Sequence, residues 1–366
     1  MDIPNSYGYM GGYDLPDKDE KRQIRRYYTR VALIMGIFIL VVNIMSRLVV
    51  YICCGILGGG FEKAAIDAGR EIFNASPLLP VIYSFFFPLA ADIVAFLEGL
   101  AITGADIGKK LRCTDFGGKD MLTATAMFFG AGTLGSFILT VVLMIWTMVG
   151  TPSRSTEMAG SIMASCPVWL KILTYLYICL IGPVMEELIY RGVLLEGLRK
   201  YGNKFGVIAT SLMFALMHEN ISQAIPAFFV GLVLGTAAVK TGSLLPSIFL
   251  HILNNSLSSV STLFLERMDT EKIRQIAMGA LETGDYDSLD GILEQMRPAA
   301  LMMGVQFVIR GGFTAAAVVI AYKFIKSRRK VFEPETPGIR ARTWKCFFSS
   351  FLWILIIIAF VIGTIV

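Results

Sequence analysis

Residues 168–198 of the chain are VWLKILTYLYICLIGPVMEELIYRGVLLEGL. This stretch is longer than the roughly 20 apolar residues that a membrane-spanning helix needs. It nevertheless contains Pro183 and, well inside it, the charged side chains of Glu186, Glu187 and Arg191. Ionisable groups inside hydrocarbon are costly, and by default they indicate a functional site. The stretch therefore predicts a helical membrane protein and marks the place where its chemistry is expected.

The composition of the whole chain agrees with a membrane location. Of the 366 residues, 55% are hydrophobic and 17% are charged, and the mean hydropathy is +0.64. Soluble proteins carry about a quarter charged residues, so an ordinary cytosolic enzyme, a disordered chain and a secreted disulfide scaffold are excluded. The net charge of +5 is interpreted as a topology signal, and no nucleic-acid partner is expected.

Nine apolar segments predict an all-α polytopic bundle of about nine membrane spans, or eight if the short fifth or sixth segment is re-entrant. The segments are 31–57, 78–102, 121–149, 168–198, 206–222, 224–239, 243–264, 302–325 and 347–366. If the N-terminus is cytoplasmic, the segments between successive spans lie alternately on the cytoplasmic and the outer side. The cytoplasmic segments then contain 21 lysines and arginines and the outside segments 7. This asymmetry satisfies the positive-inside rule. We expect an integral membrane protein, with the plasma membrane as its location.

One glycine pattern inside these segments imitates a nucleotide-binding motif. Residues 130–135 are GAGTLG, which fits the dinucleotide fingerprint GxGxxG. That fingerprint needs a preceding strand, whereas here it lies inside an apolar segment, where small residues let helices approach closely. We interpret it as a helix-packing motif.

The two histidines of the chain, His218 and His251, both lie in apolar segments. At a helical rise of 1.5 Å per residue, Glu186, His218 and His251 lie about 20, 21 and 16 Å from the cytoplasmic edge. All three are then near the middle of a hydrocarbon core about 30 Å thick. Their similar depth predicts that they form one site.

The spacing of the polar residues suggests how they divide their roles. Glu187 and Arg191 are one helical turn apart and predict an ion pair, which leaves Glu186 on another face for chemistry. His251 and Asn255 share a face in the same way. A carboxylate with two imidazoles can bind zinc and leave a position open for water. Alternatively, the glutamate activates water while histidine and asparagine donors stabilise an oxyanion. The sequence does not separate these mechanisms.

Three motifs follow one another on successive apolar segments: Glu186-Glu187-x-x-x-Arg191, Phe214-x-x-x-His218 and His251-x-x-x-Asn255. In this order they resemble the motifs of the CPBP intramembrane proteases, also called Abi. This family comprises CAAX proteases and bacteriocin-processing enzymes and includes the type II CAAX prenyl endopeptidases. The resemblance covers residues 168–262 and implies hydrolysis of a peptide bond within or at the edge of the membrane.

The resemblance also implies roles for single residues. Glu186 and His218 would activate the attacking water, and His251 and Asn255 would complete the site as metal ligands or oxyanion donors. In a metalloprotease the expected zinc ligands are Glu186, His218 and His251. The other motif residues would support the site, Glu187 and Arg191 as a pair and Phe214 by packing. The expected partners are membrane lipids and a peptide or protein substrate, with or without a lipid group.

The segments and the resemblance together divide the chain into five parts. These are a cytoplasmic N-terminal segment 1–30, accessory transmembrane helices 31–167, the family-like catalytic core 168–264, an acidic extracytoplasmic helical loop 265–300, and C-terminal transmembrane helices with a basic cytoplasmic loop 301–366.

Two other functions fit buried polar groups in a membrane. A proton-coupled transporter would use the same glutamate and histidines as a proton relay. No inverted repeat is visible, and the polar groups cluster in one third of the chain, which counts against this alternative. A catalytically silent scaffold or immunity protein is the second alternative, and the presence of every motif residue counts against it.

Overall fold

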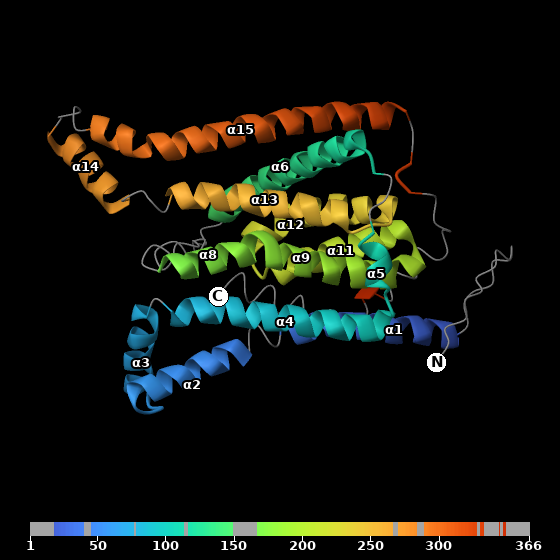
Figure 1. Ribbon diagram of the computed structural model, residues 1–366, viewed down its shortest axis with the longest axis horizontal. Helices are drawn as coiled ribbons and strands as arrows, with labels where there is room; N and C mark the ends of the chain where they lie inside the picture. The colour runs from blue at the N-terminus through green and yellow to red at the C-terminus, as the bar shows by residue number, and fades with distance from the viewer. Residues whose placement is uncertain are drawn as a thin grey trace.

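The computed structural model describes residues 18–39, 45–76, 78–112, 116–148, 167–265, 270–283, 289–327, 330–332, 344 and 347–348. In these residues every regular element is a helix, which confirms the predicted all-α bundle. The long helices run side by side along the longest axis of the molecule (Figure 1). Five helices of the described part are long and apolar enough to cross a membrane, or six if one bent pair counts as a span. The expected ninth segment lies outside the described residues except for 347–348, so the count of nine stays a prediction.

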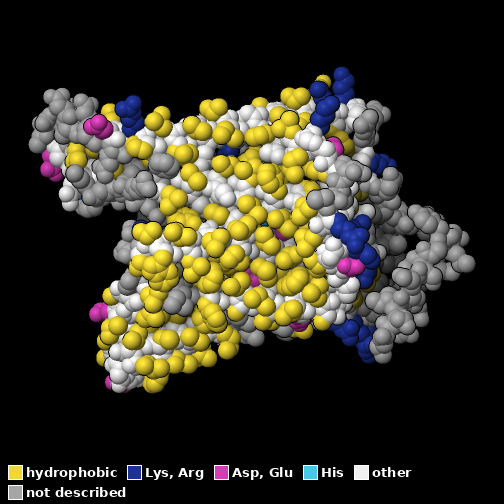
Figure 2. Space-filling model, in the orientation of Figure 1, with side chains coloured by type: hydrophobic (Ala, Val, Ile, Leu, Met, Phe, Trp, Pro, Cys, Tyr) yellow, Lys and Arg dark blue, Asp and Glu magenta, His cyan; other side chains and the backbone are white. Residues whose placement is uncertain are grey.

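The surface of the bundle suits a lipid environment. On the outer helix α15 (Leu289–Lys326), Phe307 is 79% and Ile325 74% exposed. Contiguous apolar surface of this kind is rare on soluble proteins and marks contact with a membrane or a partner. Figure 2 shows hydrophobic side chains over most of this face, with many lysines and arginines at the end where α1 begins and α15 ends.

The N-terminal part differs from the predicted first span. The described residues of the segment 31–57 belong to α1 (Lys18–Ile39), which lies beside α4 (Leu79–Thr103), and to α2 (Ser46–Gly58), and residues 40–44 lie outside the described part. Gly59, with φ 78°, ends α2 in the left-handed conformation that glycine adopts at little cost. The chain then bends by 99° into α3 (Lys63–Ala75), an element absent from the sequence-based description.

Close packing joins the outer helices to the core. A Cβ atom added to Gly135 of α6 (Gly118–Met148) would lie 2.7 Å from the Cα atom of Pro226 in α12 (Ile221–Thr241). A Cβ atom on Gly130 would contact Ala317 of α15 even more closely. The small residues therefore bring helices together, as interpreted from the sequence.

The segment 168–198 forms most of one continuous helical stretch, Val168–Tyr201. Its elements are α8 (Val168–Leu176), the π-helical turn η2 (Tyr177–Ile181), α9 (Gly182–Glu187), the π-helical turn η3 (Leu188–Leu194), α10 (Leu195–Leu198) and the 3₁₀ turn η4 (Arg199–Tyr201). Pro183 has no N–H to bond with the carbonyl of Cys179 four residues earlier. The regular α-helical pattern gives way in the same region, and wide turns of this type are frequent at functional sites.

A short helical hairpin follows. Helix α11 (Asn203–Met217) has 15 residues, which corresponds to about 22 Å and is less than a full span. Glu219 has a positive φ of 54°, and the side chain of Asn220 caps α12 by accepting a hydrogen bond from the Gln223 N–H at 2.8 Å. His218 therefore lies at the tip between the two helices.

A short connection around α5 holds the ends of the core helices together. In α5 (Ile107–Lys110), the carbonyl of Lys110 accepts a hydrogen bond from the Leu244 N–H at 2.8 Å, just before α13 (Leu245–Leu265). The Lys110 ammonium group also lies 2.7 Å from Glu196 of α10. Asp106 caps α5, and its hydrogen bonds from Lys109 hold the pKa of this carboxyl below its usual value.

The acidic segment 265–300 contains a helix, as its sequence predicts. This helix is α14 (Thr270–Thr283), which has Ile273, Ile276 and Leu281 at helical spacing. The last part of the segment belongs to α15, which starts at Leu289 and continues through residue 300 without a break. The boundary between loop and C-terminal part therefore falls inside a helix.

Candidate active site

A buried ion pair lies at the centre of the polar cluster. The side chains of Glu187 and Arg191 are both 0% exposed, and Arg191 Nη1 lies 2.8 Å from Glu187 Oε1. This confirms the predicted pair. The same carboxylate oxygen accepts a hydrogen bond from His251 Nδ1 at 3.0 Å. Because a carboxylate can only accept, the bond places a proton on Nδ1 and leaves Nε2 for the opposite side of the ring.

That opposite side faces Glu186. Glu186 Oε2 lies 3.5 Å from His251 Nε2, and the Glu186 side chain is 22% exposed. The two adjacent acids thus approach the two nitrogens of one imidazole. Glu187 is sealed and occupied by fixed partners, whereas Glu186 has access to the surroundings. This is the division of roles that the spacing suggested.

Phe214 packs between the two histidines. Its ring centroid lies 5.0 Å from that of His218 and 5.7 Å from that of His251, both edge to face. The Arg191 guanidinium lies 4.5 Å from the same ring, in a cation–π contact. His218 Nδ1 donates to the Phe214 carbonyl at 2.9 Å, so His218 also has its proton on Nδ1 and its Nε2 lone pair available.

Asn255 binds the turn that precedes Glu186. Its Nδ2 donates to the carbonyl of Ile178 in η2 at 3.0 Å, and its Oδ1 accepts from Asn254 Nδ2 at 3.3 Å. One N–H of the Asn255 amide therefore joins α13 to η2. In the sequence analysis Asn255 was assigned only a direct role.

The structure adds Asp92, a residue that the sequence analysis did not identify. Asp92 lies on α4 and is 3% exposed. Its Oδ2 accepts a hydrogen bond from the Tyr177 hydroxyl at 3.3 Å, and its carboxyl group interacts electrostatically with Glu186. The signal was present, because an acid in the apolar segment 78–102 is as costly as one in the fourth segment.

The expected zinc site can be compared with this arrangement. Both histidines have Nδ1 bonded to an acceptor, which is the usual orientation of zinc-binding imidazoles. In the described part of the chain, however, no group of three or more His, Cys, Asp or Glu side chains is placed to hold a metal ion. The geometry therefore does not fit a three-ligand site made by Glu186, His218 and His251, and zinc stays a prediction.

Comparison with known proteins concerns the same part of the chain. Residues 167–257 match the family model described as type II CAAX prenyl endopeptidase Rce1-like. The predicted family resemblance is confirmed. We refer to residues 167–257 as the Rce1-like segment; it contains Glu186, His218, His251 and Asn255, while Asp92 lies outside it.

A curated protein matches the chain over a length similar to that of the Rce1-like segment. An uncharacterized 24.3 kDa protein of Escherichia coli is 33% identical over 87 residues, which are 22% of this chain and 40% of the relative. The chain thus spans less than half the length of that protein. No solved structure matches the chain.

Proposed function

We propose that the chain is an intramembrane endopeptidase that hydrolyses a peptide bond in a membrane-associated or lipidated peptide. The observation that carries this proposal is the placement of His251 between two carboxylates inside an apolar bundle. Glu187 orients the imidazole, and Glu186 faces its free nitrogen with partial exposure. The match of the Rce1-like segment supports the same reaction class.

In the proposed reaction Glu186 is the general base. A water molecule beside Glu186 loses a proton to this carboxylate while its oxygen attacks the peptide carbonyl carbon. The carbonyl oxygen becomes an oxyanion, which the second N–H of the Asn255 amide stabilises. Glu186 then returns the proton to the leaving amine as the C–N bond breaks. His218, through its Nε2 lone pair, helps to orient the water.

The buried pair supplies orientation in this mechanism. Because Arg191 compensates the charge of Glu187, the Glu187 carboxylate remains an acceptor for His251 Nδ1 in a low-dielectric interior. His251 is then held with one nitrogen toward the reacting groups. The arrangement follows the logic of a catalytic imidazole oriented by a third group.

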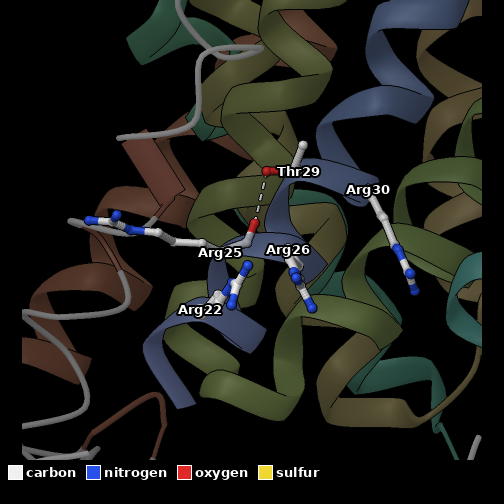
Figure 3. A pocket seen from close by; sticks show the side chains of 5 residues that line it. All are labelled: Arg22, Arg25, Arg26, Thr29 and Arg30. Carbon is white, nitrogen blue, oxygen red and sulfur yellow. Dashed lines mark hydrogen bonds between the residues drawn. The ribbon is translucent and has the colours of Figure 1, made fainter. Parts of the chain in front are cut away.

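The surface also supports anionic membrane lipids as partners. Arg22, Arg25, Arg26 and Arg30 line a hollow on α1 together with Thr29 (Figure 3). These residues immediately precede the buried Val31. Basic clusters next to a membrane span attract anionic headgroups of the cytoplasmic leaflet. This charge agrees with the proposed cytoplasmic side of the plasma membrane.

The function is tested by cleavage assays on the purified full-length protein in detergent. The substrates are prenylated and unmodified versions of one peptide, together with an unrelated leader-type peptide. We expect Glu186→Gln and His251→Ala to lower kcat by about 10²- to 10⁴-fold, the range of general-base catalysis. Glu196→Gln, an acid in the same helical stretch that binds Lys110, is the matched control and should retain activity.

Two results would contradict the proposal: cleavage by Glu186→Gln at the wild-type rate, or no cleavage of any substrate by the wild type. The prenylated and unmodified peptides differ only in the lipid, so their ratio of kcat/KM decides whether the lipid is recognised. Elemental analysis of the same samples tests zinc. About one zinc per chain, lost in His251→Ala, would support the metalloprotease prediction.

A further inference from the structure

The π-helical turn η2 is held from two sides by side chains of different helices. From α4, Asp92 accepts the hydrogen bond of the Tyr177 hydroxyl at 3.3 Å. From α13, the side-chain amide of Asn255 donates to the backbone carbonyl of Ile178 at 3.0 Å. The backbone carbonyl of Asn255 lies 3.9 Å from Cys179 Sγ. Three consecutive residues of one turn therefore have partners outside their own helix.

The shape of this turn affects the direction of Glu186. A π-helical turn contains about one residue more than an α-helical turn. Each residue of an α-helix rotates the chain by about 100°, so a change of η2 to α-helix would rotate every side chain that follows it. Glu186 lies on α9, the helix that directly follows η2, and its distance of 3.5 Å to His251 Nε2 requires one particular rotation.

We propose that Asp92 is a positioning residue of the site: its carboxyl group accepts the hydrogen bond of the Tyr177 hydroxyl and so fixes η2 in the form that directs Glu186 toward His251. This inference rests on the proposed function. Asp92 contributes from α4, outside the Rce1-like segment, so the helices before this segment are part of the site. Asp92 is buried and the contact is partly buried, which limits the competition from water.

The test uses variants that separate the hydrogen bond from the charge. Tyr177→Phe removes only the hydroxyl, Asp92→Ala removes the acceptor, and Asp92→Asn keeps an acceptor oxygen without the charge. Glu98→Gln is the matched control, because Glu98 is another acid of α4 that has no hydrogen-bond partner for its buried Oε2. All four variants are first compared with wild type for yield and monodispersity.

For cleavage, we expect Tyr177→Phe and Asp92→Ala to lower kcat about fivefold to tenfold with little change in KM. A double variant that combines Tyr177→Phe with Asp92→Ala should have the same kcat as either single variant, because both substitutions remove the same hydrogen bond. Asp92→Asn should retain activity within about twofold, since its amide oxygen still accepts the hydroxyl proton. Glu98→Gln should match wild type.

A second readout does not depend on cleavage. Cys179 lies in η2 and is a half-buried free thiol, so its rate of maleimide labelling reports on this turn. The other five cysteines (Cys53, Cys54, Cys113, Cys166 and Cys346) are replaced by alanine in every sample. We expect Tyr177→Phe and Asp92→Ala to be labelled at least threefold faster than wild type, and Asp92→Asn and Glu98→Gln at the wild-type rate.

The proposal is overturned if Tyr177→Phe is labelled and cleaves like wild type. It is also overturned if Asp92→Asn is as impaired as Asp92→Ala while Tyr177→Phe is active, because the carboxylate would then act by charge and not through Tyr177. If wild type cleaves no peptide, the proposed function fails, and the labelling rates alone decide whether Asp92 holds the turn.

Discussion

At the scale of single residues, the central feature is the Glu187 carboxylate, which forms an ion pair and accepts a hydrogen bond from a histidine through the same oxygen. Glu187 Oε1 lies within hydrogen-bond distance of both Arg191 Nη1 and His251 Nδ1. The i,i+4 spacing predicts the first contact, because both partners lie on one helix. The second joins residues 64 positions apart, and helical spacing carries no information about such a distance. For the same reason, the contact between Asp92 and Tyr177, which are 85 positions apart, was not predicted from the sequence.

The two adjacent glutamates should respond differently to substitution. Glu187→Gln leaves the fully buried guanidinium of Arg191 without its counter-charge, which costs about 3–5 kcal/mol in comparable buried pairs. Glu186→Gln should leave stability nearly unchanged, because this side chain is partly exposed and has no fixed cation. Thermal unfolding in detergent measures both. Equal melting temperatures for Glu187→Gln and wild type would contradict the structural role of the pair.

At the scale of elements, hydrophobic patterning locates helices more reliably than their irregularities. It correctly places α14 and the helices of the Rce1-like segment, because apolar residues recur at helical spacing. The π-helical turns η2 and η3 leave no such signal, since one additional residue in a turn hardly changes an apolar run. The predicted span 31–57 ends beside Gly58, Gly59 and Gly60, close to the end of α2. Helix α3, which follows them, was missed because it is too short and too polar to be recognised as a span.

The turn between α11 and α12 offers a test at this scale. Asn220 Oδ1 accepts from the Gln223 N–H at 2.8 Å, and Asn220 Nδ2 donates to the His218 carbonyl at 2.7 Å. Asn220→Ala should lower stability by about 1 kcal/mol through loss of the cap, and should lower kcat because His218 is less well held.

Asn220→Asp separates these effects, because it keeps the cap but cannot donate to the His218 carbonyl. Its unfolding temperature should therefore be close to that of wild type, while its kcat remains reduced. Stability loss of the same size in both variants would show that the cap is not what Asn220 supplies.

At the scale of the whole molecule, the bundle is organised around the Rce1-like segment, with further helices packed on both sides (Figure 1). Composition and charge asymmetry are sufficient to predict an integral membrane protein, because they average over many residues. The number of spans is harder to predict. It depends on where each helix bends and on whether α11, with 15 residues, crosses completely, and neither is encoded in mean hydropathy.

The packing of α6 on α12 gives a prediction about the assembled bundle. A Cβ atom at Gly135 would lie 2.7 Å from the Pro226 backbone, whereas one at Gly132 would be at an ordinary 3.6 Å from Val230. Gly135→Ala should therefore destabilise the protein by about 1–3 kcal/mol, as overpacking does. Gly132→Ala is the control and should be neutral. Identical unfolding of the two variants would contradict the close approach.

The basic hollow on α1 gives a second prediction at this scale. Replacing Arg22, Arg26 and Arg30 by glutamine should reduce the amount of anionic phosphatidylglycerol retained after purification. Each arginine removed should weaken the binding free energy of the lipid by about 1 kcal/mol. Replacing Lys323, Lys326 and Lys330 by glutamine removes equal charge near the end of α15 and serves as the control. Native mass spectrometry counts the bound lipid. Equal losses in both triple variants would indicate a general charge effect and no site on α1.

The central claim is that water activated by Glu186 is added to a peptide bond, and isotope incorporation tests it most directly. Purified wild type and Glu186→Gln are incubated with the cleavable peptide in H₂¹⁸O, and the products are weighed by mass spectrometry after a single turnover. General-base activation of water by Glu186 predicts one ¹⁸O atom in the new C-terminal carboxyl group with wild type and almost no product with Glu186→Gln. Equal amounts of labelled product from both proteins would contradict it.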